Sequence, residues 1–440
     1  MFNITNKLDL EDIVKDKSKY YPELDAIRGL AIFLLLCYHT DVANYLDLGI
    51  FPARFFEYII FTAGVPVFFF LSGLGLTIKY KERRLNIKQF YKNRYSNLVP
   101  PYIMWSFLIM LLYYAGEQII FTGGSISDLF DIYVILDILI NIGIQIATGH
   151  VYTLWFVYVL FLYYLLFPFV LKLFKKINQK SRKVILLVVF LLTFLIYFSA
   201  ELGVNIFFID DEVIIYAYSS ENINFNFDLG YFFRFAFYFV NFLMGITLAF
   251  NYEDVRSSMK KNRTLKILIF VFSIFCYTFF QLAALVWDIS IIGSTKTIFL
   301  STSSILLCLL IFLQFTKWDS IDIIRENALS SGSTNDNPNK ENMSETNLKE
   351  RIQNANMKFW WYTGQRSTGI YFTHRIIMAP VWIVIYIIFN VSMWQNLGTS
   401  IPRAEAFVYA AITLGLTYVG CIILIKIIRK LPYNKILIGK

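Results

Sequence analysis

Long apolar runs, each about as long as a membrane-crossing helix, recur along the chain. A helix needs roughly 20 apolar residues to cross a hydrocarbon layer of ~30 Å. Such runs lie near 26–43, 55–78, 99–120, 151–171, 184–200, 229–250, 265–283, 297–315, 360–388 and 405–428. They are continuous rather than alternating, which indicates helices and not the strands of a membrane barrel. The pattern therefore predicts an all-α polytopic membrane protein with about ten transmembrane helices.

Composition supports a membrane protein over a soluble one. The chain is 57% hydrophobic and 16% charged, whereas soluble domains average about 45–50% apolar and about 25% charged residues. Its four cysteines, Cys37, Cys276, Cys308 and Cys421, lie in apolar runs without the spacing of a metal site or a redox pair. We expect neither a structural disulfide nor a bound metal.

Polar stretches divide the chain into four parts. Residues 1–25 form a charged tail, 26–315 hold the first eight predicted helices, 316–358 form a loop, and 359–440 hold the last two helices and the C-terminus. Within the loop, residues 329–349 are rich in Ser, Asn and charged residues. Such a composition cannot build a core, so this segment is expected to be a flexible cytoplasmic linker.

The distribution of Lys and Arg predicts the orientation. Most of the 40 basic residues fall in segments that share one side of the membrane if the N-terminus is cytoplasmic. Segment 201–228, on the opposite side, carries acidic residues and no basic ones. Basic residues favour the cytoplasmic side, so both termini are predicted to be cytoplasmic. The membrane in which the protein lies is expected to be the plasma membrane. The net charge of +9 then reflects topology and attraction to anionic lipids, and nucleic acid is not an expected partner.

The first apolar run begins with charged residues and ends on a histidine. Arg28 and His39 are eleven residues apart, so at ~100° per residue they share a helix face, separated by about 16 Å along the axis. Asp25, three residues before Arg28, can pair with it. Arg28 is thus expected at the cytoplasmic boundary and His39 beyond the bilayer midplane. The alternative is that Arg28 is only a snorkelling anchor and that His39 only lies at the level of the lipid headgroups.

The other two histidines are also expected in the outer half of the membrane. His150 lies just before one predicted span, and His374 lies about fourteen residues into a span that enters from the cytoplasm. Ionisable groups at such depth usually face a bundle interior or an aqueous cavity. An imidazole exchanges a proton near neutral pH, so these residues are candidates for general base catalysis on a hydroxyl.

Five motifs together resemble the acyltransferase 3 family of integral membrane acyltransferases. In chain order they are LDAIRGLAIFLLLCYH (24–39), PVFFFLSGLGLT (66–77), FYKNRYSNLVPPYIMW (90–105), TLWFVYVL (153–160) and GQRSTGIYFTH (364–374). The resemblance implies an acyl-CoA donor, such as acetyl-CoA, on the cytoplasmic side. It also implies an acceptor hydroxyl on an envelope carbohydrate or lipid-linked sugar.

The candidate residues fit that reaction. His39 is expected to deprotonate the acceptor hydroxyl, with His374 as the next candidate; both direct transfer and an acyl-histidine intermediate remain open. The donor phosphates favour arginine, and the candidates are Arg28, Arg83, Arg84, Arg94, Arg366 and Arg375. Arg375 and Arg366 are also candidates for stabilising oxyanion charge. The matching motifs imply that His150, Trp155 and Tyr371 contact the acceptor.

Two other classes of function remain as alternatives. A ten-helix transporter or glycan export factor would use the buried Arg and His residues as a substrate or proton pathway. An assembly factor without turnover would use them as polar contacts between helices. The basic segment 79–98 also has a simpler interpretation, since a cytoplasmic loop of a membrane protein is basic without binding a ligand.

The predicted orientation can be checked by cysteine labelling. We expect position 435 to be cytoplasmic and position 211 to be outside, because segment 201–228 lacks basic residues. An impermeant thiol reagent added to intact cells should label a cysteine at 211 and not one at 435. The reverse pattern would show that the orientation is wrong.

Overall fold

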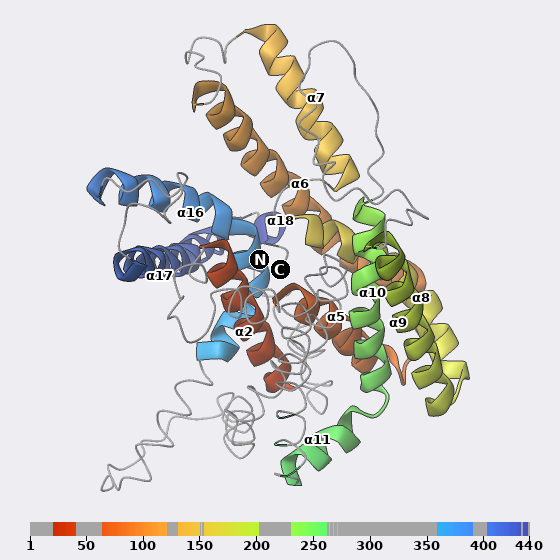
Figure 1. Cartoon of the computed structure of the whole chain (residues 1–440). Coiled ribbons are helices and arrows are strands. Elements are labelled where there is room, and N and C mark those ends of the chain that lie inside the picture. Colours follow the sequence, from red (N-terminus) through yellow and green to blue (C-terminus); the bar gives the residue numbers. More distant parts are fainter. Residues whose placement is uncertain are drawn as a thin grey trace, which may run out of the picture.

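The computed structural model describes residues 21–40, 64–120, 131–149, 151, 154–201, 230–261, 359–389, 403–432 and 434–438, together with 264, 267 and 271. Its ordered elements in these ranges are helices, and no strand occurs in them. They are α2 (Pro22–His39), α5 (Gly64–Tyr80), α6 (Ile87–Ile120), α7 (Ile132–Thr148), α8 (Trp155–Lys176), α9 (Gln179–Glu201), α10 (Gly230–Ala249), α11 (Tyr252–Lys261), α16 (Ser367–Phe389), α17 (Arg403–Ile428) and α18 (Asn434–Ile438). The all-α fold class is confirmed for this part of the chain (Figure 1).

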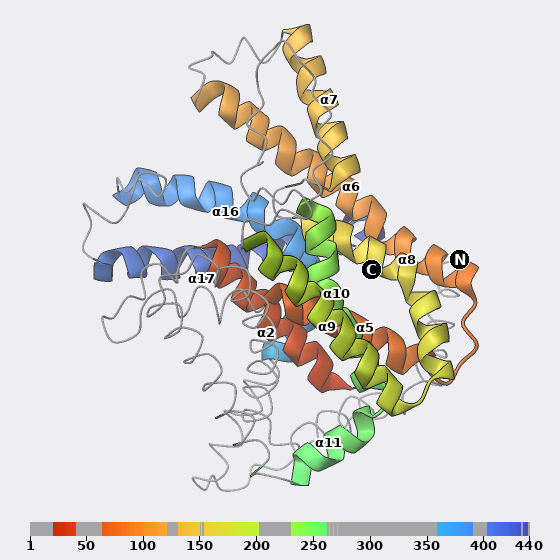
Figure 2. The same cartoon turned by 45° about the vertical axis from the view of Figure 1, so that its right-hand side comes forward.

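Helices α5 and α10 pack together at the centre of the bundle, backbone against backbone (Figure 2). A Cβ atom on Gly73 of α5 would overlap the carbonyl oxygen of Phe242, and one on Gly245 of α10 would overlap that of Phe70. Small residues let helix backbones approach closely in membrane proteins. The Leu-Ser-Gly stretch at 71–73 therefore serves as a helix-packing motif.

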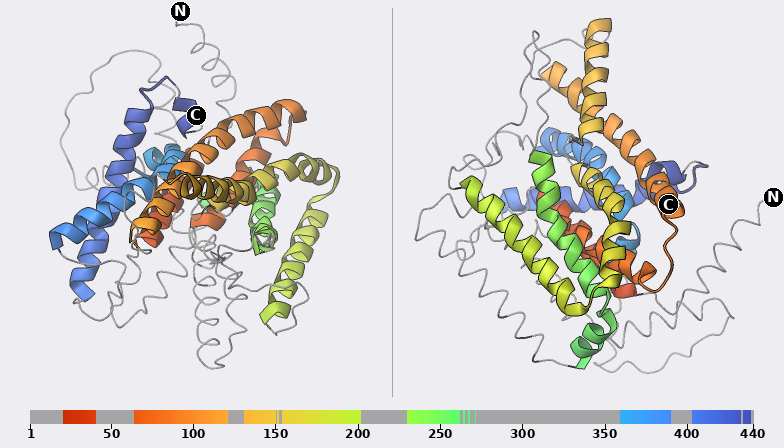
Figure 3. Two further views of the ribbon diagram at one scale, coloured as in Figure 1. Left: turned by 90° about the horizontal axis from the view of Figure 1, so that it is seen from above. Right: turned by 90° about the vertical axis from the view of Figure 1, so that its right-hand side faces the viewer.

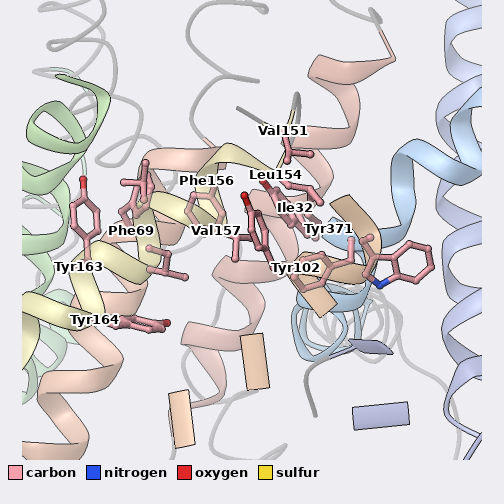
Figure 4. Packing of buried hydrophobic residues seen from close by; sticks show 14 of the residues in the cluster. Ile32, Phe69, Tyr102, Val151, Leu154, Phe156, Val157, Tyr163, Tyr164 and Tyr371 are labelled. Atoms are coloured by element: carbon pink, nitrogen blue, oxygen red, sulfur yellow. The ribbon is translucent and has the colours of Figure 1, made fainter. Parts of the chain in front are cut away.

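An aromatic core connects these helices to α8 and α16. Phe156 of α8 lies 4.5 Å from Phe69 and 5.4 Å from Tyr371, measured between ring centroids (Figure 4). Tyr163, one of the largest fully buried side chains, stacks on Phe242 at 5.1 Å. Offset and edge-to-face aromatic contacts add to the apolar area that they bury. This core holds α8 between the α5–α10 pair and the start of α16.

Helices α6 and α7 form a pair that projects from the bundle (Figures 1 and 2). Helix α6 begins at Ile87, earlier than the predicted span near 99–120, because Asn86 accepts a hydrogen bond from the Gln89 amide at 3.1 Å and starts the helix within the basic segment. Helix α7 was not among the predicted spans. Its apolar run is interrupted by Asp137, Asn141 and Gln145, one polar residue per turn.

The C-terminal helices lie side by side, and the chain then turns back into the bundle (Figures 1 and 3). Helix α17 packs along α16 and is followed by the short helix α18. Trp105 of α6 donates a hydrogen bond to the carbonyl oxygen of Leu437 at 2.6 Å, and Ile438 is buried. Helix α18 therefore fills the space between α6, α16 and α17.

Four helices in the described ranges are long and apolar enough to cross a membrane: Ile87–Tyr114, Trp155–Lys176, Ser367–Ile385 and Val408–Ile428. Gly64–Tyr80, Ile132–Thr148 and Tyr238–Ala249 are shorter apolar helices. The predicted tail up to residue 20, the loop 316–358 and nearly all of the predicted spans near 265–283 and 297–315 lie outside the described residues. The total of about ten spans therefore remains a prediction.

The glycine contact between α5 and α10 predicts a difference between two helical Gly→Ala substitutions. Gly73→Ala should destabilise the protein, because its methyl group would push the two helices apart. Gly143→Ala is the matched control, since no atom lies within 4 Å of the added Cβ; helix propensity favours it by about 0.5–1 kcal/mol. Thermal unfolding in detergent should show a lower midpoint for Gly73→Ala alone. Equal midpoints would contradict the close packing.

Candidate active site

Helix α2 carries two of the predicted site residues. Pro22 occupies the first turn, where its missing N–H costs nothing, and Glu23 and Asp25 favour the helix N-terminus. Arg28 donates to Asp25 at 2.7 Å, which confirms the expected pairing. On its other side, the Arg28 guanidinium would lie 3.4 Å from a Cβ on Gly75 of α5. The small residue at 75 therefore leaves room for this side chain.

The start of α2 packs directly, backbone against backbone, on the helical segment 359–365 that precedes α16. A Cβ on Gly29 would overlap the carbonyl oxygen of Trp360, and one on Gly364 would overlap that of Asp25. Glycine is therefore required at both positions. The contact fixes the position of α16 along α2.

Ten residues beyond this contact on each segment, the two membrane histidines meet. His39 follows Gly29 by the same interval as His374 follows Gly364, a rise of about 15 Å in a helix. The imidazole rings stack with centroids 5.2 Å apart and planes 19° apart. His374 is fully buried and half-buried His39 closes the last turn of α2. Two of the predicted catalytic residues thus lie together.

Arg375 and Tyr371 complete the surroundings of the histidine pair. Arg375 reaches from α16 to α2, where its Nη2 donates to Nδ1 of His39 at 3.0 Å. Nδ1 of His374 donates to the carbonyl oxygen of Tyr371 at 2.6 Å. The Tyr371 ring packs edge-on against Phe156, one residue from Trp155 (Figure 4). Trp155 itself lies against Tyr238, with centroids 5.6 Å apart.

Arg366 lies in a second location, at the turn between the 359–365 segment and α16. Its guanidinium sits 3.3 Å from the centroid of the Tyr362 ring and donates to the Tyr362 carbonyl oxygen at 3.1 Å. A small pocket there is lined by Gln365, Arg366, Thr368, Gly369, Ile425, Arg429 and Ile438. This places Arg429 and the end of α18 beside Arg366, which the sequence did not indicate.

The basic segment contacts α8. Arg83 and Arg84 are exposed between α5 and α6, and the Arg83 carbonyl oxygen accepts a hydrogen bond from Lys175 at 2.7 Å. Arg94 lies 5.8 Å from the ring centroid of Tyr164. The structure therefore brings His39, His374, Arg375 and Tyr371 together, whereas Arg28, Arg366 and the basic segment make separate sets of contacts.

A buried polar cluster ties the start of α2 to α11. Glu23 is 1% exposed, and its Oε1 accepts hydrogen bonds from Arg256 Nε at 2.8 Å and from the Tyr252 hydroxyl at 3.1 Å. Tyr21 donates a hydrogen bond to Glu253, which also lies in α11. Burial, followed by the nearby Glu23 carboxylate, raises the pKa of Tyr252 well above its usual range, so its hydroxyl remains a donor. The cluster anchors the helix that carries Arg28 and His39.

Among the described residues, no group of three or more His, Cys, Asp or Glu side chains is placed to hold a metal ion. His150 lies outside those residues, so its expected contact with the acceptor stays a prediction.

A family model described as an acyltransferase domain matches residues 21–331, more than half of the chain. The chain belongs to the acyltransferase 3 family. No curated protein and no solved structure matches it. In this acyltransferase the match covers α2, α5, α8 and α10 but ends before α16. The pairing of His39 with His374 therefore follows from the tertiary structure alone.

Several residues that shape this site were missed from the sequence. Gly29 directly follows Arg28, and Gly364 lies two residues before Arg366. Both arginines were predicted site residues, yet a glycine in an apolar run gives no indication of which backbone it will contact. Glu23 and Arg256 are more than two hundred residues apart. Their pairing had no local signal, whereas Asp25 and Arg28 are neighbours on one helix turn.

The α2–α11 cluster predicts a stability effect that depends on charge. Arg256→Ala should destabilise the protein by about 3–5 kcal/mol, because it leaves the Glu23 carboxylate buried without its cation. Adding Glu23→Gln to that variant should recover part of the loss, since the buried charge is then gone. Unfolding midpoints of the two single variants and the double variant would check this. Additive losses would show that the two side chains act independently.

Proposed function

We propose that this member of the acyltransferase 3 family transfers an acyl group from cytoplasmic acyl-CoA to a hydroxyl in the plasma membrane. Acetyl is the preferred acyl group, and an envelope carbohydrate or lipid-linked sugar is the preferred acceptor. The observation that carries the proposal is the stacked pair of His39 and His374 with Arg375 beside it. Paired imidazoles in a water-poor site suit proton transfer from a hydroxyl to a leaving thiolate.

The donor is assigned to the predicted cytoplasmic face. Arg28 lies about 16 Å along α2 from His39, at the end of the helix where CoA would arrive, and its guanidinium fits phosphate oxygens. Arg366, with Arg429 nearby, offers further cationic groups at the start of α16. Arg83, Arg84 and Arg94 are proposed as weaker, more exposed contacts.

The acceptor is assigned to the opposite side of the histidine pair. Tyr371 and Trp155 supply aromatic surface, which suits the apolar faces of a sugar ring, and Tyr371 directly adjoins His374. His150 is proposed to join them.

A pure exporter would need the same polar groups for transport but would have no use for CoA, so donor binding separates the two functions.

Variants of Arg28 test the donor assignment. Arg28→Ala should weaken CoA binding or raise the donor KM about 10- to 100-fold, because a charge-assisted hydrogen bond contributes about 1.5–3 kcal/mol. Arg28→Lys should also be impaired, since it keeps the charge and loses the planar guanidinium fork. Exposed Lys180→Ala is the control. CoA affinity of purified variants in nanodiscs is the measurement, and normal affinity of Arg28→Ala would contradict the assignment.

Envelope glycans from cells with and without the gene test the reaction itself. Mass spectrometry should find a carbohydrate that carries an acyl group only when the gene is present, and the mass difference would identify that group. Purified protein that neither binds CoA nor acylates any envelope fraction would contradict the proposed function.

A further inference from the structure

The two histidines of the stacked pair are held in different ways. In both rings Nδ1 is hydrogen-bonded, but the partners have opposite chemistry. His39 meets a guanidinium, and His374 meets a backbone carbonyl. Since the hydrogen bond at one ring nitrogen fixes the state of the other, these partners give the rings different roles.

For His39, the partner requires that Nδ1 accepts. The guanidinium of Arg375 has only N–H donors and remains protonated in proteins. Its Nη2 lies 3.0 Å from Nδ1 of His39, so the lone pair of that nitrogen is engaged. The neutral ring therefore carries its proton on Nε2. In this form His39 can donate a hydrogen bond but offers no nitrogen that can take a proton.

For His374, the partner requires that Nδ1 donates. A carbonyl oxygen has no proton, and that of Tyr371 lies 2.6 Å from Nδ1. The neutral ring therefore has its free lone pair on Nε2. This atom is buried, and no hydrogen-bond partner for it exists among the described residues. An unpaired buried nitrogen is costly, which is understandable if a substrate hydroxyl occupies that position during the reaction.

We propose that His374 is the general base of the acyl transfer and that His39 is the hydrogen-bond donor to the thioester carbonyl. Arg375 is the positioning residue that fixes this division of roles. The inference rests on the proposed function and differs from the sequence-based expectation, in which His39 was the first candidate for the base and His374 the next. The ring centroids lie 5.2 Å apart, so both imidazoles belong to one site.

The reaction then balances without another reactant. Nε2 of His374 takes the proton of the acceptor hydroxyl as its oxygen attacks the thioester carbonyl carbon. The C–O bond forms, and the negative charge that develops on the carbonyl oxygen accepts a hydrogen bond from Nε2–H of His39. The C–S bond breaks, and the leaving thiolate takes the proton from His374. The products are the acylated acceptor and CoA thiol, and both rings return to their starting states.

The tautomers can be observed without any substrate. The chain has three histidines, so ¹⁵N-histidine labelling gives three ring systems, and His39→Gln and His150→Gln variants assign them by elimination. NMR of the protein in nanodiscs should find His374 protonated on Nδ1 and His39 on Nε2. Arg375→Ala should convert His39 to a mixture of tautomers and leave His374 unchanged, and Arg375→Lys should restore the original form. The opposite tautomer at either ring would overturn the proposal.

Turnover at saturating donor then tests the roles. Glutamine is the informative replacement, because its amide N–H can donate a hydrogen bond but cannot act as a base. His374→Gln should lose about 10²–10⁴ in kcat, whereas His39→Gln should lose much less, with CoA affinity unchanged in both. Thr373→Ala, beside His374 on α16, is the control for disturbance of the helix. Arg375→Ala should lower kcat with little change in donor KM.

The outcomes separate this inference from the proposed function. Greater loss in His39→Gln than in His374→Gln would overturn the division of roles while leaving acyl transfer intact. Absence of any transfer by the wild-type protein, with both tautomers as expected, would instead contradict the proposed function.

Discussion

The site depends on the contact between Gly29 of α2 and Gly364 of the turn before α16. Both positions lack room for a Cβ atom because each faces a carbonyl oxygen of the other segment. Two backbones held this closely cannot slide past each other without clashes, since packed interiors deform little. The equal ten-residue intervals to His39 and His374 then bring the imidazoles to one level. A shift of one helical turn would move one ring past the other by 5.4 Å.

Two polar pairs reinforce this arrangement, and each joins α2 to another element. Glu23 pairs with Arg256 of α11, and His39 with Arg375 of α16. In hydrocarbon, an ionisable group without a partner is costly, so such groups face the bundle interior and pair there. A displacement of α2 would separate these pairs as well as the glycine contact. The apolar core sets how tightly the helices pack, and the polar pairs select one relative position.

Much of the fold could be predicted because the signals are local. Apolar runs identified α5, α8, α10, α16 and α17, and the i, i+3 spacing identified the Arg28–Asp25 pair. The prediction was less accurate where local signals conflict. Helix α6 starts in a basic stretch, because charged residues outside the hydrocarbon are compatible with a helix capped by Asn86. Helix α7 was missed because Asp137, Asn141 and Gln145 interrupt its hydrophobicity. Helix α18 is too short to have a periodicity of its own and is held by its contact with Trp105.

The sequence alone determined the class of the protein, its family resemblance and the residue types of the site, since hydrophobicity, charge and motif spacing can be read along the chain. It placed His39 and His374 at similar depths in the membrane. Only the tertiary structure decided that they stack and that Arg375 joins them, because those contacts cross more than three hundred residues of chain. A guanidinium and a carbonyl at the same ring nitrogen impose opposite proton positions. His374 meets a carbonyl of its own helix, whereas His39 meets a guanidinium only because α2 packs against α16.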